Sequence, residues 1–240
     1  MHRNARLVGV SNARNRPKVA GLNDVYDHIL QSIVDQRLPP GTKLNELMLC
    51  EIFNIGRRQV SQVLIRLSHD ELIDLFPNRG AFVAAPNVEA AKAIFEVRRT
   101  IEDAVVRLVV VNITREQLST LKKNVEQEAA HRRTNRIREA IKLSGEFHIL
   151  LGEFCGNAIL ASLVKQLVAR TSLVVSLYED QETMSCWHDD HGQFVKHLEN
   201  RAAGPASSLM RKHLLEIEKS LKLDRPKQVP FDLRTIYAPE

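Results

Sequence analysis

The amino-acid sequence predicts a mainly α-helical protein, and three observations support this fold class. Hydrophobic residues make up 44% of the 240 residues, which is enough to build a core. Glycine, with 10 residues, and aromatic residues, at 5%, are both scarce, whereas helix-forming Leu, Ala and Glu are plentiful. Apolar residues recur at helical spacing along most of the chain, and the period changes only near residues 73–83.

The N-terminal part is predicted to contain a basic arm and three short helices. Residues 1–20 contain five Lys or Arg residues and no acidic residue, so we expect a flexible arm. Apolar residues at helical spacing over 25–34 predict the first helix, and Pro39-Pro40-Gly41 ends it. Asn45 is a suitable N-cap for a second helix that reaches Phe53. A third helix follows, and its inner face carries Val60, Val63, Leu64 and Leu67.

The apolar spacing then changes from a helical to an alternating period. Ile73–Phe76 and Ala81–Val83 are short extended runs, and Pro77–Gly80 between them has the composition of a turn. These runs predict a β-hairpin directly after the third helix. Three helices followed by a hairpin is the element order of a winged helix-turn-helix domain, which we expect to cover residues 21–86.

The remainder shows only the helical period and predicts an all-helical bundle over residues 87–222. Asn87 is a suitable N-cap for its first helix, and Thr114 forms a capping box with Gln117 for the second. Residues 223–240 remain as a tail. The predicted helices cover residues 88–111, 115–132, 136–155, 157–179, 183–201 and 205–222.

The charge of the chain is informative by its position rather than by its total. The formal charge is +5 and the isoelectric point is near 9.2, yet residues 21–86 carry six Lys or Arg residues against eight acidic ones. The three cysteines form no CxxC pair, which favours a reducing compartment. The sequence has neither the apolar region of a signal peptide nor 18 consecutive apolar residues. We therefore expect a cytoplasmic protein that does not enter a membrane.

Three arginines on the third predicted helix are candidates for contacts to DNA. Arg57, Arg58 and Arg66 lie in a stretch, residues 56–66, that contains no acidic residue. An arginine near the start of a recognition helix can bind O6 and N7 of guanine, and Arg79 at the hairpin tip can reach a neighbouring groove. An isolated arginine pair more often belongs to a solvated helix face. The surrounding helix-turn-helix order favours DNA binding instead.

Three stretches of the chain follow a known family pattern: Leu38–Glu46, the spacing from Val60 to Ile73, and the wing sequence Phe76–Val83. Through them, residues 22–222 resemble the GntR family of bacterial transcription regulators. The helical remainder resembles the FCD effector domain of the FadR-like branch. The resemblance implies a DNA-binding domain, a helical domain that binds an effector and dimerises, and no enzymatic activity. The residues that it assigns to DNA contact are Arg57, Arg58, Gln59, Ser61, Gln62, Arg66, Arg79 and Gly80.

This chain departs from the family pattern at several positions that face DNA. Gly56 replaces the usual Ser or Thr, Gln59 replaces the usual Pro, and Ser61-Gln62 replaces the usual Arg-Glu pair. Leu47 stands where the family often has Arg, whereas Arg58 adds a cation. We infer an atypical operator sequence and weaker phosphate contact. Each lost phosphate contact should reduce the slope of log affinity against log salt concentration by about one unit.

Three histidines on separate predicted helices are candidates for a metal site. His148, His191 and His213 each share a helical stripe with apolar residues, so each side chain is expected to point inward. Three imidazoles can bind Zn²⁺ or a similar ion and leave a position open for water or a ligand. The alternative is three separate core histidines, each satisfied by its own hydrogen bond. Their spacing alone does not distinguish the two.

The resemblance to FCD domains implies that these histidines bind a divalent metal ion, either Zn²⁺ or Ni²⁺, Mn²⁺ or Mg²⁺. In that pattern an Asp four residues before the first His supplies a fourth ligand, and this chain has Ser144 there. Without that Asp, the site would bind metal through three histidines alone, bind it more weakly, prefer a different ion, or hold no metal. Water or an effector carboxylate would complete the coordination.

Arg98 is a further polar residue that is expected to face inward, because it shares a helical stripe with Ile94, Ile101 and Val105. It either pairs with a nearby Glu or extends its head to water, or else clamps an effector carboxylate beside the metal. The FCD resemblance favours a small carboxylate as effector, with Arg98 and Ser144 as its binding residues.

The sequence favours a dimeric, ligand-responsive regulator that binds a pseudo-palindromic, double-stranded DNA operator. An effector that favours one arrangement of the helical domains would change the spacing of the two winged helices. One alternative is a sensor that binds a long apolar effector without metal. A second is a hydrolase with a three-histidine metal site, although no general base is apparent near the histidines.

Overall fold

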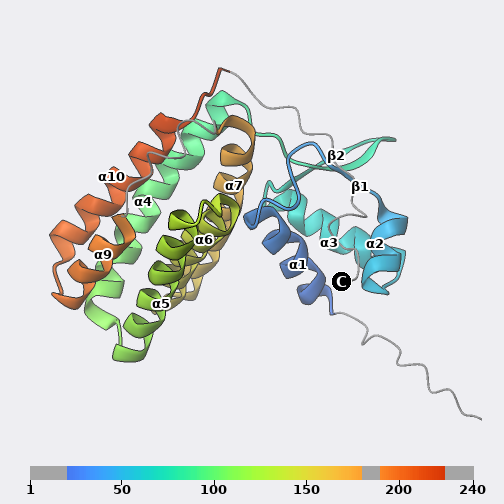
Figure 1. Ribbon diagram of the computed structural model, residues 1–240. Coiled ribbons are helices and arrows are strands. Elements are labelled where there is room, and N and C mark those ends of the chain that lie inside the picture. The colour runs from blue at the N-terminus through green and yellow to red at the C-terminus, as the bar shows by residue number, and fades with distance from the viewer. Residues whose placement is uncertain (1–20, 180–189, 225–240) are drawn as a thin grey trace, which may run out of the picture.

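The computed structural model describes residues 21–179 and 190–224. The predicted arm at 1–20, residues 180–189 and the tail beyond 224 lie outside the described residues. The described chain consists of a winged-helix part followed by a helical bundle, which confirms the predicted fold class (Figure 1).

The winged-helix part contains the predicted helices and hairpin, with one additional strand. Asn45 caps α2 as predicted, since its side chain accepts hydrogen bonds from two backbone N–H groups, and Asn54 ends the helix in the left-handed conformation. The hairpin pairs Ile73 with Val83 and Phe76 with Gly80. The elements are α1 (Leu22–Val34), β1 (Lys43–Leu44), α2 (Glu46–Phe53), α3 (Arg57–His69), β2 (Ile73–Phe76) and β3 (Gly80–Val83).

The additional strand β1 pairs antiparallel with β3 and makes a three-stranded sheet of order β1-β3-β2. Its two residues are too short to produce an alternating pattern, so the sequence could not reveal it. The pairing sets Lys43 opposite Phe82 at the base of the wing.

The bundle helices agree with the predicted ranges to within a few residues. Asn87 and Thr114 act as the expected N-caps. For the helix expected over 183–201, the described part begins at Asp190, and 183–189 lie outside the described residues. The helices are α4 (Val88–Asn112), α5 (Arg115–Arg133), α6 (Ile137–Phe154), α7 (Ala158–Tyr178), α9 (Asp190–Glu199) and α10 (Ala203–Ser220).

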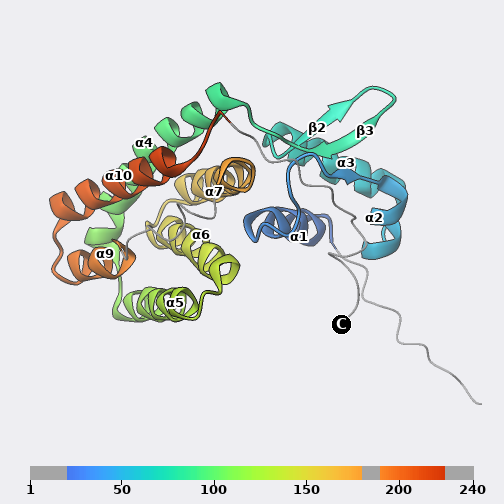
Figure 2. The same ribbon diagram turned by 45° about the horizontal axis from the view of Figure 1, so that its top comes forward.

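The winged-helix part rests on the bundle through α1, which lies beside α7 (Figures 1 and 2). One continuous cluster of buried apolar residues extends through both parts, and a second cluster lies within the bundle. Polar contacts surround this junction, where Lys165 reaches Asp27 at 2.7 Å and Gln166 donates to Asp70 at 3.0 Å. The winged-helix part, which carries the DNA-binding candidates, therefore packs directly on the bundle that carries the three histidines.

Helix α7 is long and apolar enough to cross a membrane when only its length and composition are considered. It is instead a central helix of the bundle, in contact with α1, α4 and α6, and half of its most apolar stretch is buried. Packing in the core accounts for its composition.

Candidate functional site

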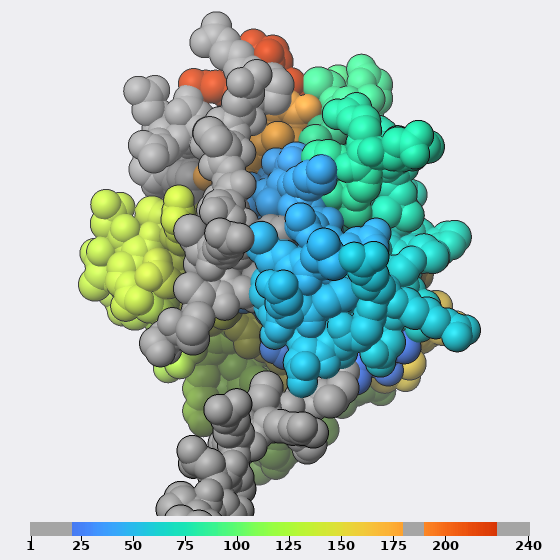
Figure 3. Space-filling view, turned by 90° about the vertical axis from the view of Figure 1, so that its right-hand side faces the viewer, coloured from blue at the N-terminus to red at the C-terminus, as the bar shows by residue number. Residues whose placement is uncertain are grey.

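The start of α3 presents two arginines to solvent. Arg57 and Arg58 are the first two residues of the helix and both are exposed. Within the described residues, neither side chain makes a hydrogen bond or an ion pair. Figure 3 looks onto this side of the molecule, where the segment of α2 and α3 lies at the surface. Both guanidinium groups are thus available to a partner.

The other candidates on α3 differ in how they are held. The Gln59 side chain accepts a hydrogen bond from the Gly56 N–H at 3.1 Å and closes the start of the helix. Ser61 is half-buried, and Gln62 is exposed. Arg66 donates to Asn23 at 2.9 Å, and its guanidinium lies 3.8 Å from the centroid of the Tyr26 ring. Arg66 therefore joins α3 to α1, a structural role that its sequence position did not indicate.

The wing carries the remaining candidates and one cation that sequence reasoning missed. The Arg79 guanidinium lies 5.3 Å from the Phe76 ring centroid and 5.8 Å from that of Phe82. Gly80 follows with φ of 93°, a conformation that favours glycine. The Lys43 Nζ atom, on β1, lies 5.8 Å from the centroid of the Phe82 ring, which belongs to its partner residue on β3. The wing thus groups two cations around a pair of aromatic rings.

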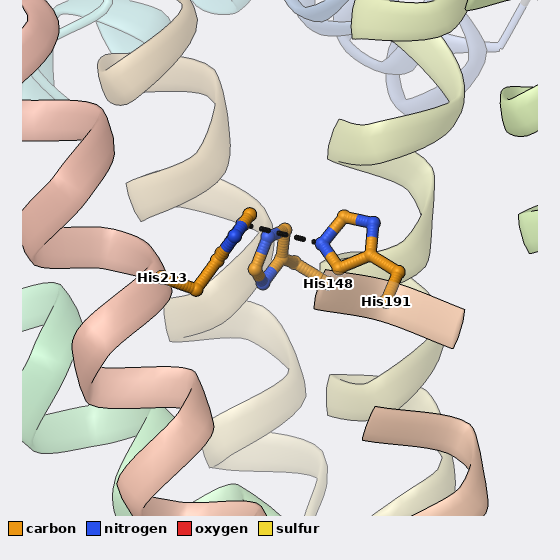
Figure 4. Close-up of side chains that lie close together, drawn as sticks. All are labelled: His148, His191 and His213. Carbon is orange, nitrogen blue, oxygen red and sulfur yellow. Dashed lines mark hydrogen bonds between the residues drawn. The ribbon is translucent and has the colours of Figure 1, made fainter. Parts of the chain in front are cut away.

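The three histidines come from α6, α9 and α10 and converge in the bundle (Figure 4). One candidate ligand atom from each lies within 4.8 Å of the others, and all three residues are buried. The Nε2 atoms of His191 and His213 are 3.2 Å apart. The structure therefore brings together residues that are 43 and 22 positions apart in the chain.

Each histidine has a carboxylate beside its Nδ1 atom. Nδ1 of His148 lies 2.6 Å from Glu102, and Nδ1 of His191 lies 2.7 Å from Glu128. Nδ1 of His213 lies 3.3 Å from Asp190. This is the arrangement in which carboxylates orient metal-binding imidazoles, because each Nδ1 atom faces a carboxylate.

The charges of these groups are set by their mutual contacts. Burial raises the pKa of Glu102, but the Arg98 guanidinium and His148 outweigh this effect and hold it at about 2. Burial similarly opposes ionisation of Glu128, yet its neighbours, led by His191, lower its pKa to about 2. Burial lowers the pKa of His148 to about 3. The neutral imidazole donates from Nδ1 to an ionised carboxylate, which leaves a lone pair on Nε2.

These residues fit a divalent metal ion. Among the described residues, His148 Nε2 is buried and has no hydrogen-bond partner, which is costly unless a further group satisfies it. The 3.2 Å between Nε2 of His191 and Nε2 of His213 is close to the separation of about 3.3 Å between two nitrogens on a tetrahedral zinc ion. Imidazole nitrogens that converge in this way are suitable ligands for such an ion.

A small cavity of about 30 Å³ adjoins the histidine cluster. Arg98, Ser144 and His148 line it, and all three are buried. Arg98 donates from Nε to Glu102 at 2.5 Å, the nearby glutamate that one of the sequence interpretations required. Within the described residues the terminal guanidinium nitrogens make no hydrogen bond, and Arg98 lines the cavity. Arg98 can therefore pair with Glu102 and still line the cavity.

Sequence reasoning missed Glu102 and Glu128, although both left a signal. Glu102 lies four residues after Arg98 and shares its inward face. Glu128 continues the buried stripe of Leu121, Asn124 and Val125 on α5. An acidic residue on an inward stripe indicates a buried partner, because an unpaired buried carboxylate is costly.

Comparison with known proteins shows which family combines these two parts. Residues 93–216 match the FCD domain, and residues 22–83 match bacterial regulatory proteins of the gntR family. The chain is 25% identical over 199 residues to the HTH-type transcriptional repressor RspR of Escherichia coli K12, covering 82% of this chain and 87% of the relative. It is 21% identical over 181 residues to the Nta operon transcriptional regulator of Aminobacter aminovorans, covering 75% and 85%.

Solved structures show the same fold. Escherichia coli McbR/YncC superimposes with a TM-score of 0.69 at 18% identity, over 83% of this chain and 94% of that chain. The curated relatives are transcription regulators and not enzymes. Because the FCD match covers more than half of the chain and the gntR match covers the winged helix, this protein belongs to the FCD-containing GntR regulators and is a DNA-binding transcription regulator.

Proposed function

We propose that this regulator responds to a small carboxylate effector and binds a pseudo-palindromic operator in the cytoplasm as a homodimer. Residues 21–86 would contact DNA through the start of α3 and the wing, as their exposed arginines and the family support. Residues 87–222 would bind the effector and dimerise. The observation that carries the effector proposal is the position of the buried Arg98 at a cavity shared with His148.

A divalent metal ion held by His148, His191 and His213 is part of this proposal. Their converging imidazoles and the three carboxylates beside them support it. When bound, such an ion supplies an open coordination position that attracts a carboxylate oxygen. Ser144, where the family pattern has Asp, lines the cavity four residues before His148, so the chain leaves room for a ligand oxygen there.

Glu102 connects the proposed metal and effector sites. Its two carboxylate oxygens bind different partners, Oε1 the Arg98 guanidinium and Oε2 the His148 imidazole. A change at Arg98 therefore alters the electrostatic environment of His148, and the reverse, through the buried Glu102 side chain. The small volume of the cavity and the polar residues Arg98 and Ser144 in its otherwise largely apolar lining also favour a compact acid over a long apolar effector.

Binding measurements on the full-length protein test this function. Fluorescence anisotropy with fragments of the DNA upstream of its own coding sequence, at fixed salt, should detect specific binding over competitor DNA. Light scattering should give a dimer. Acetate, glycolate or malonate should change the operator affinity. The absence of specific DNA binding would contradict the operator proposal, and an affinity insensitive to all three acids would contradict the effector proposal.

The exchange Glu128→Gln should lower the affinity for zinc by about 10- to 100-fold. Glutamine preserves the shape of the side chain, but its neutral amide binds the His191 Nδ1–H more weakly than the carboxylate does. Competition with a chromophoric chelator measures the change. Glu126→Gln, at an exposed position of the same helix, is the matched control and should leave zinc affinity unaltered. Equal zinc affinities for the two variants would contradict an orienting role for Glu128.

A further inference from the structure

The cavity beside the histidine cluster is lined by residues from both parts of the protein. In the described chain, its walls come from α4, α6, α7 and α10 of the bundle, with one exception. Gln36 belongs to the turn that follows α1 in the winged-helix part. This cavity therefore adjoins the DNA-binding part directly.

The turn that carries Gln36 is held firmly by its backbone. The Gln36 N–H donates to the Ile33 carbonyl at 2.9 Å, and the Arg37 N–H donates to the Ser32 carbonyl at 2.9 Å. Gln36 adopts a φ of 54°, in the left-handed region that non-glycine residues rarely occupy. The turn thus fixes the direction in which its side chain leaves the backbone.

The side chain of Gln36 has an unsatisfied donor. Its Nε2 atom is buried and has no hydrogen-bond partner among the described residues. A buried amide N–H without an acceptor costs roughly 1–3 kcal/mol, so an acceptor at this place would be favourable. Because Gln36 lines the cavity, an oxygen atom of a molecule in the cavity can provide that acceptor.

The neighbours of Gln36 attach the same turn to α6. Asp35 pairs with Lys142 of α6 at 3.2 Å. Val34 lies so close to Gly145 that a Cβ atom on this glycine would be 3.4 Å from Val34 Cγ1. Gly145 directly follows Ser144, the proposed effector-binding residue. The end of α1 therefore packs closely against the part of α6 that lines the cavity.

We propose that Gln36 binds the effector and that the bound acid joins α1 to the bundle. Arg98 would hold a carboxylate oxygen of the acid, and the Gln36 Nε2–H would donate to another of its oxygens. This inference rests on the proposed carboxylate effector and adds how the signal reaches the DNA-binding part. A ligand that contacts both parts favours the docked arrangement of the winged helix, and this bias changes operator affinity.

The test compares Gln36→Met and Gln36→Glu with wild type in the full-length protein. Methionine has a similar length and no donor, so the affinity for acetate, glycolate or malonate should fall about 3- to 10-fold by calorimetry. Glutamate places a negative charge beside the acid and should weaken binding further. Gln193→Met, at an exposed position of α9, is the control and should behave as wild type.

Two further readouts separate effector contact from a purely structural role. The ratio of operator affinities with and without saturating acid should move towards one in Gln36→Met. Hydrogen exchange over residues 32–38 should slow on addition of acid in wild type and not in the variant. Unfolding temperatures confirm that the variants are folded.

The outcomes distinguish this inference from the function on which it rests. If wild type binds the acids and Gln36→Met and Gln36→Glu match the control in affinity and in the operator ratio, the role of Gln36 is overturned and the effector proposal stands. If wild type binds none of the acids, both are overturned.

Discussion

Replacing His213 with alanine should reduce zinc affinity by more than about 100-fold, beyond the loss expected for a supporting carboxylate. The exchange removes one of the three converging imidazoles and leaves two, which are too few for a stable structural or catalytic zinc site. Mass spectrometry of metals in the purified protein should give about one zinc or similar divalent ion per wild-type chain and almost none in the variant. His148→Ala and His191→Ala should have the same effect.

The control for this experiment is His197→Ala, because His197 lies on α9 with His191 but outside the cluster. It should retain the full metal content. Removal of metal by a chelator should lower the unfolding temperature of wild type and of His197→Ala, since an ion present at 100 times its Kd adds about 2.7 kcal/mol to stability. It should not affect His213→Ala. Unchanged metal content in all three cluster variants would contradict the proposed site.

The exchange of Arg57 or Arg58 for alanine should weaken operator binding by about 10- to 100-fold, the range expected for one arginine bound to a guanine. Both side chains are exposed at the start of α3 and are not engaged elsewhere in the described chain. Anisotropy titrations at several salt concentrations measure the loss. An arginine that contacts a base should also relax sequence preference, whereas one that contacts a phosphate should lower the salt slope by about one unit.

Two arginine variants serve as comparisons for this result. Arg138→Ala removes the same charge from an exposed position of α6 and should leave operator affinity nearly unaltered. Arg66→Ala should instead lower the free energy of unfolding, because its guanidinium lies on the Tyr26 ring and bonds Asn23. If Arg57→Ala and Arg58→Ala bound the operator as tightly as Arg138→Ala, the start of α3 would not be the reading surface.

The sequence predicted the helices well because their signals are local. Caps at Asn45, Asn87 and Thr114 are read from one residue and its next few neighbours, and the structure confirms all three. Strand β1 gave no such signal, because a strand of two residues forms only by pairing with β3, which lies almost 40 residues away along the chain. Local periodicity cannot report a partner at that separation.

The sequence by itself determined the mainly helical fold, the order of the helices and the hairpin, and which face of each helix turns inward. It also placed three histidines and Arg98 on such inward faces, as the structure confirms by their burial. Only the tertiary structure decided what those side chains meet, including Glu102 at His148 and Arg98, and Gln36 at the cavity beside the histidines. The physical reason is that helical spacing fixes a direction, whereas a contact depends on how separate helices pack, which no local stretch of sequence encodes.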